Sequence, residues 1–209
     1  GTGMWAVIGI LTALHQRAVT GQGCLVDAAM LETALAWQGF NVANHEGSGG
    51  WPERMGLQGP LLVPNGGFEA GDGTLVMTVG TPAQFARLCR VLEREDLLDD
   101  PRFATNDGRV ANRPAFNDTV NETLRGKTRA EWNALLNAAD VPNSPLMNLG
   151  ETMDHPQTAA TGIMQKSPDG SFSLIGPPIR FDGKRPPFSR NAPELGEANQ
   201  EVFAFMKDG

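Results

Sequence analysis

The stretch that decides the fold runs from Gly67 to Leu92 and reads GFEAGDGTLVMTVGTPAQFARLCRVL. Gly71-Asp72-Gly73 is a turn signal between two short segments of strand-forming residues, so we expect a β-hairpin here. Thr81-Pro82 then places an N-cap residue before a proline at the first helical position. A helix should follow, with its apolar face made by Phe85, Leu88, Val91 and Leu92.

The residues after this stretch also carry helix signals. We expect helix over residues 106–125, with breaks at Gly108 and Pro114. A further helix should open with the capping box formed by Thr128 and Glu131. Residues 143–190 are typical of short strands and turns, and a last helix is predicted over 197–206.

Apolar residues before the hairpin recur at helical spacing, so residues 3–19 are predicted to form a helix that ends near Gly21. Residues 24–26 predict a short buried strand, and residues 28–44 a second helix. Residues 46–67 are rich in glycine and proline and show little periodicity. A long loop of this kind often carries function. The whole pattern is α/β, with too few strands for a complete doubly wound sheet.

Composition excludes several classes of function. The 209 residues contain 17 Lys and Arg against 24 Asp and Glu, and the net charge of −7 argues against a nucleic-acid partner. The apolar stretch 4–14 is too short to span a bilayer, so we expect no membrane partner. Two cysteines far apart in sequence, Cys24 and Cys89, are typical of reduced, buried thiols in a cytoplasmic protein.

Catalytic motifs are not evident from residue chemistry alone. His15, His45 and His155 share no metal-ligand spacing with other ligands, so we predict structural roles for them and no metal site. Residues 1–6 fit the G-x-G-x-x-A dinucleotide pattern, but no strand precedes them. A tight turn into the first helix is the favoured interpretation.

Longer strings are more informative than single residues. Four blocks stand out in order along the chain: GILTALHQR (9–17) with TGQG (20–23) and VDAAM (26–30); DPRFATN (100–106) with Arg109 and Asn112-Arg113; DHPQ (154–157); and RNAPELGE (190–197). Together these blocks resemble the family III CoA-transferases, also called the CaiB/BaiF family. One departure is Ala198, where that family usually carries histidine.

The resemblance implies that the chain is about the C-terminal half of a family member, with Rossmann-like large-domain segments flanking a small α+β domain. Residues 1–46 would belong to the large domain, and 47–67 would form a Gly/Pro-rich linker and active-site loop. Residues 68–148 would be the small domain, and 149–209 a segment that returns toward the large domain. The family's subunits interlock as a homodimer.

The family's reaction moves CoA between an acyl-CoA and a carboxylic acid. An aspartate attacks the thioester to give a mixed anhydride, and the released thiolate then forms an enzyme–CoA thioester. A carboxylate is a weak nucleophile, so the reaction needs exact placement of the aspartate and backbone N–H donors that stabilise the oxyanion. CoA is a substrate here, and no permanently bound cofactor is expected.

Site residues follow from the same resemblance. The nucleophilic aspartate would fall just before Gly1, outside the chain, with Gly1, Thr2 and Gly3 as its flanking turn. Gly56, Gly59 and Pro60 would belong to a mobile loop that closes over the active site, where glycine allows close backbone approach. Met30 matches a position near bound CoA, and is explained equally well as a core methionine.

Two alternatives stay open. An α-methylacyl-CoA racemase shares the fold but needs an acid–base pair, and racemases carry a glutamate shortly before a Gln-Phe pair. Residues 80–85 here read GTPAQF and contain no acid, which favours the transferase. The second alternative is a non-catalytic homologue that binds acyl-CoA.

Overall fold

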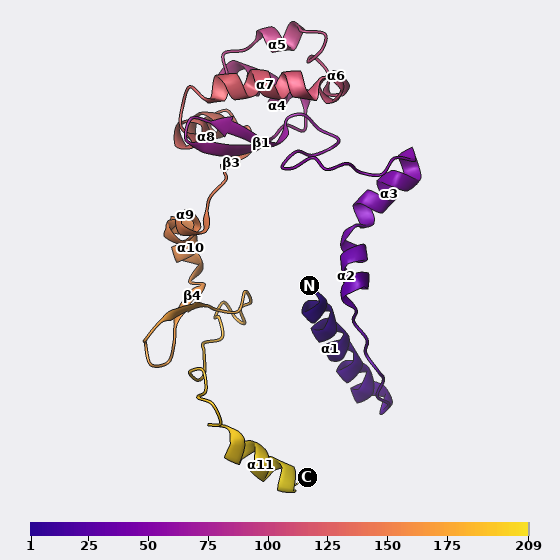
Figure 1. Ribbon diagram of the computed structural model, residues 1–209, viewed down its shortest axis with the longest axis vertical. Helices are drawn as coiled ribbons and strands as arrows, with labels where there is room; N and C mark the ends of the chain where they lie inside the picture. Colours follow the sequence, from indigo (N-terminus) through magenta and orange to yellow (C-terminus); the bar gives the residue numbers. More distant parts are fainter. Residues whose placement is uncertain (209) are drawn as a thin grey trace. The chain divides into compact units, whose positions relative to one another are not determined.

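The chain divides into two compact units, Gly1–Ser144 and the residues from Pro145 onward. The computed structural model describes residues 1–208. The first unit contains, in order, α1 (Thr2–Thr20), α2 (Met30–Trp37), α3 (Gly39–Ser48), β1 (Asn65–Ala70), β2 (Gly73–Thr78), α4 (Pro82–Val91), α5 (Asp96–Asp99), α6 (Asn106–Ala111), α7 (Arg113–Leu124), α8 (Arg129–Ala138) and the start of β3 (Asn143–Pro145) (Figure 1). The second contains α9 (Leu149–Asp154), α10 (Pro156–Thr161), β4 (Met164–Lys166), β5 (Ser173–Ile175) and α11 (Asn199–Asp208).

The predicted hairpin is confirmed. β1 and β2 pair antiparallel from Asn65↔Thr78 to Ala70↔Gly73, so Gly71 and Asp72 form a two-residue turn. β2 lies between β1 and β3. The turn contacts the start of α8, where Asp72 Oδ1 accepts a hydrogen bond from the Arg129 amide at 2.6 Å.

Helix caps also form as the sequence predicts. The Thr81 hydroxyl caps α4 by accepting from the Gln84 amide, with Pro82 at the first helical position. Thr128 and Glu131 make the capping box of α8. α8 is tied to the end of α7 because Trp132 Nε1 donates to the Leu124 carbonyl at 2.7 Å.

The hydrophobic core lies entirely between Val63 and Val141. It fills the space between the β1–β2 hairpin and helices α4, α7 and α8, and α7 packs on β1 while α8 packs on β2. Arg109 is the one charged side chain among the buried residues of the described chain. The largest fully buried side chains in this core are Trp132, Phe68, Phe103, Phe116, Leu75, Met77, Leu88, Leu97, Leu124 and Leu136.

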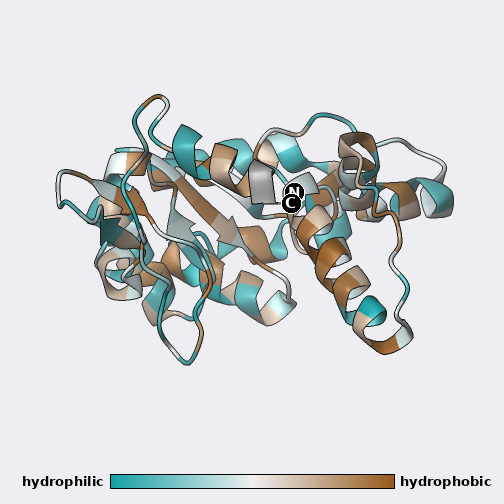
Figure 2. Ribbon diagram, turned by 90° about the horizontal axis from the view of Figure 1, so that it is seen from below, coloured by the Kyte–Doolittle hydropathy of each residue, from teal (hydrophilic) through white to brown (hydrophobic). Residues whose placement is uncertain are grey.

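Most large apolar side chains outside residues 63–141 are exposed. α1 is an example: Leu11 is 61% exposed and Val19 76%. Figure 2 shows the helix that begins at the N-terminus coloured mainly as hydrophobic. Apolar exposure on this scale marks an interaction surface, so α1 and its neighbours carry a face suited to another polypeptide segment.

Three expectations for residues 24–44 are wrong. Residues 24–26 form no strand and Leu25 is 85% exposed, because no described strand pairs with them. Cys24 is likewise exposed, and only Cys89 is buried. The second helix is broken at Gln38, and α3 then continues to Ser48.

Downstream, the break in the 106–125 helix falls at Asn112, and Gly108 lies inside α6. Residues 143–190 contain two helices that we did not predict. Each has a local start signal: Asn148 and Glu151 form a capping box for α9, and His155 caps α10 ahead of a proline.

The position of the core gives a first prediction. Phe116→Ala, at a fully buried site, should lower the free energy of unfolding by about 3–5 kcal/mol. Leu11→Ala on the exposed face of α1 should lower it by less than about 0.5 kcal/mol. Denaturant unfolding can be followed by fluorescence, because Trp132 is the buried tryptophan of the four. Equal losses at the two sites would contradict this account of the core.

The two cysteines give a second prediction. Burial raises the pKa of the Cys89 thiol to about 11, so almost none of it is thiolate at pH 8. A thiol reagent at pH 8 should therefore label exposed Cys24 quickly and Cys89 only in denaturant. Mass spectrometry of peptides counts the labels at each position. Rapid labelling of Cys89 in the native chain would show that its site opens readily.

Candidate functional site

The residues predicted as the catalytic turn lie at the start of α1. Gly1 is the N-cap, whereas Thr2 and Gly3 are already in the first helical turn. Gly1 packs against the Trp37 ring so closely that a Cβ at position 1 would collide with it. The Thr2 hydroxyl donates to Thr33 Oγ1 at 3.3 Å, so α1 and α2 are held together at this end.

A pocket of about 290 Å³ lies beside this junction, between α1 and the start of α2. Met30 is the first residue of α2, and 79% of it is exposed. The interpretation of Met30 as a core methionine is therefore wrong for the described chain, and its side chain is available to a ligand or another segment. The pocket is lined by Trp5, Gly9, Val26, Asp27, Ala28, Ala29, Glu32, Thr33 and Ala36.

The predicted loop at residues 56–60 is hydrogen-bonded to the start of β1. The Gly59 amide donates to the Asn65 carbonyl at 2.7 Å, and the Gly67 amide donates to the Leu57 carbonyl at 3.3 Å. The Gln58 side chain adds a bond from Nε2 to the Gly67 carbonyl at 2.7 Å. The loop is thus anchored along one side of the hairpin.

Gly56 and Gly59 serve different purposes in this loop. A Cβ at Gly59 would collide with the amide end of Asn65, whose Oδ1 accepts from the Thr78 hydroxyl at 3.0 Å. Glycine at 59 therefore makes room for Asn65. Gly56 has φ of 60°, has open space around it, and its amide has no hydrogen-bond partner among residues 1–208. Of the loop residues predicted to face substrate, Gly56 keeps a free N–H donor.

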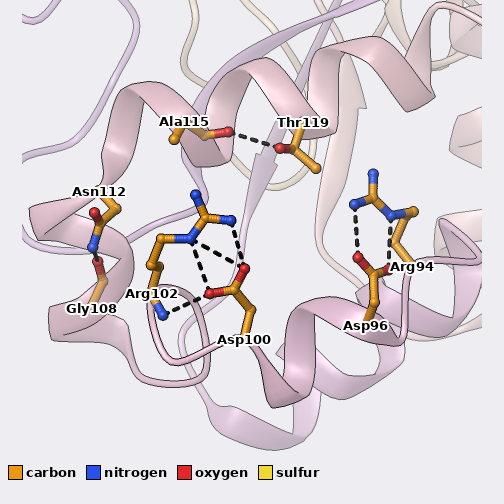
Figure 3. Close-up of polar contacts among 8 residues, drawn as sticks. All are labelled: Arg94, Asp96, Asp100, Arg102, Gly108, Asn112, Ala115 and Thr119. Carbon is orange, nitrogen blue, oxygen red and sulfur yellow. Dashed lines mark hydrogen bonds and ion pairs between the residues drawn. The ribbon is translucent and has the colours of Figure 1, made fainter.

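The DPRFATN block forms a compact turn before α6, shown in Figure 3. The Asp100 carboxylate accepts from the Arg102 amide at 2.9 Å and from its guanidinium at 2.7 Å. These bonds hold the pKa of the Asp100 carboxyl below its ordinary value. The Thr105 hydroxyl then caps α6 by accepting from the Gly108 amide. The block therefore fixes where α6 begins.

Two of the three histidines contact other residues of the chain. His45 stacks on Trp51 with ring centroids 3.6 Å apart. His155 Nδ1 accepts from the Gln157 amide at the start of α10. His15 is exposed on α1. Among residues 1–208, no three His, Cys, Asp or Glu side chains come together as a metal site would require.

The predicted site residues thus form two groups, one at the start of α1 and α2 and one beside β1. Within residues 1–208, no hydrogen bond joins residues 1–37 to residues 56–60. No helix in that range is long and apolar enough to cross a membrane. Sequence reasoning missed the role of Asn65, because its contact with Gly59 depends on how the chain folds back.

Comparison with known proteins gives consistent results. The family described as CoA-transferase family III matches residues 1–199. The chain is 33% identical over 196 residues to the acetyl-CoA:oxalate CoA-transferase of Acetobacter aceti, covering 93% of this chain and 50% of that protein. It is 28% identical to the human succinyl-CoA:glutarate CoA-transferase, covering 97% and 47%. The chain spans about half the length of the curated relatives it matches.

A solved structure supports the fold class. The crystal structure of a CaiB/BaiF family protein from Brucella suis matches with a TM-score of 0.83 at 31% identity, covering 98% of this chain and 54% of that one. The prediction of a mixed α/β fold of the CaiB/BaiF type is confirmed.

The packing of Gly59 gives a third prediction. Gly59→Ala should destabilise the chain by about 1–3 kcal/mol, because the new methyl group displaces the Asn65 amide. In an Asn65→Ala background the same change should cost less than about 0.5 kcal/mol. Gly56→Ala is the matched control: its cost of about 1–2 kcal/mol comes from positive φ and should not depend on Asn65. An equal cost of Gly59→Ala in both backgrounds would contradict the packing argument.

Proposed function

The chain belongs to CoA-transferase family III, and we propose that it supplies about half of an enzyme that moves CoA from an acyl-CoA to a carboxylic acid. The observation that supports this most is the match along almost the whole chain to named CoA-transferases. In this proposal the other half of the relatives' length provides the aspartate nucleophile, immediately before Gly1.

The start of α1 suits such a nucleophile. An aspartate there would lie at the N-terminal end of a 19-residue helix. Because unpaired N–H groups and the helix dipole stabilise a negative charge at that end, the carboxylate would stay ionised and ready to attack. The close packing of Gly1 on Trp37 would fix the turn that carries it.

Gly56 and Met30 also have roles in the proposed reaction. Gly56 offers an N–H donor that has no hydrogen-bond partner among residues 1–208, and a donor of this kind can stabilise the oxyanion of a thioester or anhydride. Met30 offers an exposed thioether next to the pocket between α1 and α2, where it can pack against an apolar part of CoA.

The substrate class follows from the reaction type and from the relatives. An acyl-CoA donor and a carboxylic acid acceptor are required, with CoA as a substrate and no permanently bound cofactor. Two of the relatives are named for oxalate and glutarate, so we propose dicarboxylic acids as the first acceptors to examine.

Assembly and location complete the proposal. The exposed apolar faces of α1 and α2 support association with the remaining part of the enzyme and a homodimer. The free thiols of Cys24 and Cys89 fit a reducing compartment, and we place the protein in the cytoplasm.

The test compares this chain with the longer protein that contains it. The longer protein should transfer CoA from acetyl- or succinyl-CoA to oxalate or glutarate, and the chain alone should not. In the presence of acyl-CoA, hydroxylamine should inactivate the longer protein and leave a modified aspartate just before Gly1. Transfer by the chain alone, or transfer without such an adduct, would contradict the aspartyl mechanism.

Racemisation is the alternative reaction, and the structure of α4 is unfavourable to it. Thr81 caps that helix and Pro82 begins it where a racemase needs an acid, and Pro82 has neither an ionisable side chain nor an N–H. Asp72, in the turn at the other end of β2, forms an ion pair with Arg129. Incubation of the longer protein with 2-methylacyl-CoA in deuterated water should therefore give no α-deuterium at a catalytic rate. Rapid uptake without an enzyme adduct would favour the racemase.

A further inference from the structure

Three polar side chains from the family block converge on residues 60–63, which lie between the loop at 56–60 and β1. Asn106 and Arg109 are three residues apart on α6, and Arg113 follows four residues later at the start of α7. The spacing of three places Asn106 and Arg109 on one face of α6, and Arg113 follows the break at Asn112. Each of the three binds backbone atoms of residues 60–63.

Asn106 makes two of these bonds. Its Nδ2 donates to the Leu61 carbonyl at 2.9 Å, and its Oδ1 accepts from the Val63 amide at 3.2 Å. One side-chain amide thus satisfies both a donor and an acceptor of a segment that belongs to no helix or strand. Backbone groups in such a segment need partners of this kind when water is excluded.

Arg109 holds the buried end of the segment. It is 4% exposed, its Nε donates to the Val63 carbonyl at 2.6 Å, and its Nη1 donates to the Phe103 carbonyl at 2.7 Å. The guanidinium also lies over the Phe85 ring at 3.8 Å. Its partners are therefore carbonyl oxygens and a ring face, and no carboxylate is in hydrogen-bond contact with it within residues 1–208.

Arg113 holds the end of the segment nearest the loop. Its Nη2 donates to the Pro60 carbonyl at 2.9 Å, and its Nη1 lies 3.5 Å from the Leu62 carbonyl. Arg113 is half-buried, so these bonds are partly screened from water. Because Pro60 directly follows Gly59, this contact acts on the loop itself.

We propose that Asn106, Arg109 and Arg113 are positioning residues that hold residues 60–63 and so fix the loop at 56–60 in its working place. The part of this inference that concerns catalysis rests on the proposed function. An aliphatic residue at 109 would avoid the cost of burying a charge. The polar side chains are explained by what they bind, namely a segment outside helices and strands that joins the loop at 56–60 to β1.

The test uses Arg113, since its loss leaves the buried core intact. Arg113→Ala and Arg113→Lys are compared with the matched control Arg125→Ala, which removes the same charge from an exposed site at the end of α7. Hydrogen exchange is measured by mass spectrometry on the peptide covering 55–64. The kcat and KM of CoA transfer are measured on the longer protein, normalised to titrated active sites.

Arg113→Ala should raise exchange in that peptide roughly tenfold, as expected for the loss of a bond to a charged donor. The kcat should fall with KM for acyl-CoA changed less than about twofold, since the loop acts on the transition state. Arg113→Lys should restore part of both effects, because it keeps one charged donor, and Arg125→Ala should change neither.

The two parts of the inference fail in different ways. Unchanged exchange in Arg113→Ala would overturn the anchoring role itself. Raised exchange with unchanged kcat would overturn the role of the anchored loop in catalysis. If the unsubstituted longer protein transfers no CoA, the proposed function fails, and the catalytic part of the inference fails with it, whereas the exchange result still decides the anchoring role.

Discussion

The guanidinium of Arg109 is the contact on which the arrangement of the first unit depends. It joins the carbonyl of Val63 to that of Phe103 inside a core that is otherwise apolar. Burial lowers the pKa of Arg109, yet the group stays charged because its ordinary pKa is so high. Without it, two buried carbonyl groups would lack donors, and each such group costs about 1–3 kcal/mol.

This contact links stability to the proposed chemistry. The hydrophobic core at 63–141 makes a rigid base, and residues 60–63 are held against it by side chains of α6 and α7. Functional groups are often carried on loops that a rigid scaffold positions. The loop at 56–60 fits this pattern, since it is bonded to β1 on one side and to α7 on the other. By contrast, α1 and α2 have no such rigid core beneath them. Their apolar residues are exposed and are available to a further segment.

Local sequence signals predicted much of the structure that surrounds the core at 63–141. The turn at Gly71-Asp72 and the caps at Thr81 and Thr128 depend on residues within a few positions of one another, so the sequence alone reveals them. The family was also evident from strings of residues such as 100–106. The strand predicted at 24–26 failed because a strand needs a partner that local pattern does not reveal.

Other features depend on contacts between distant residues. Asn106 and Leu61 are 45 positions apart, and Arg109 and Val63 are 46 apart, so no spacing rule predicts their bonds. The same holds for Gly59, whose neighbour is set by the folding of the loop onto Asn65. Its glycine predicts close approach to a substrate, and the structure shows in addition close approach to Asn65. The boundaries of the domains and the roles of Gly1, Thr2, Gly3, Gly56, Gly59, Pro60 and Met30 stay predictions.

The central claim is that the anchored loop at 56–60 faces the thioester during CoA transfer. The most direct measurement is a crystal structure of the longer protein with an acyl-CoA bound. We expect residues 60–63 to keep their bonds to Asn106, Arg109 and Arg113, and the Gly56 N–H to lie about 3 Å from the thioester or anhydride oxygen. A bound acyl-CoA whose thioester lies away from residues 56–60 would contradict the account.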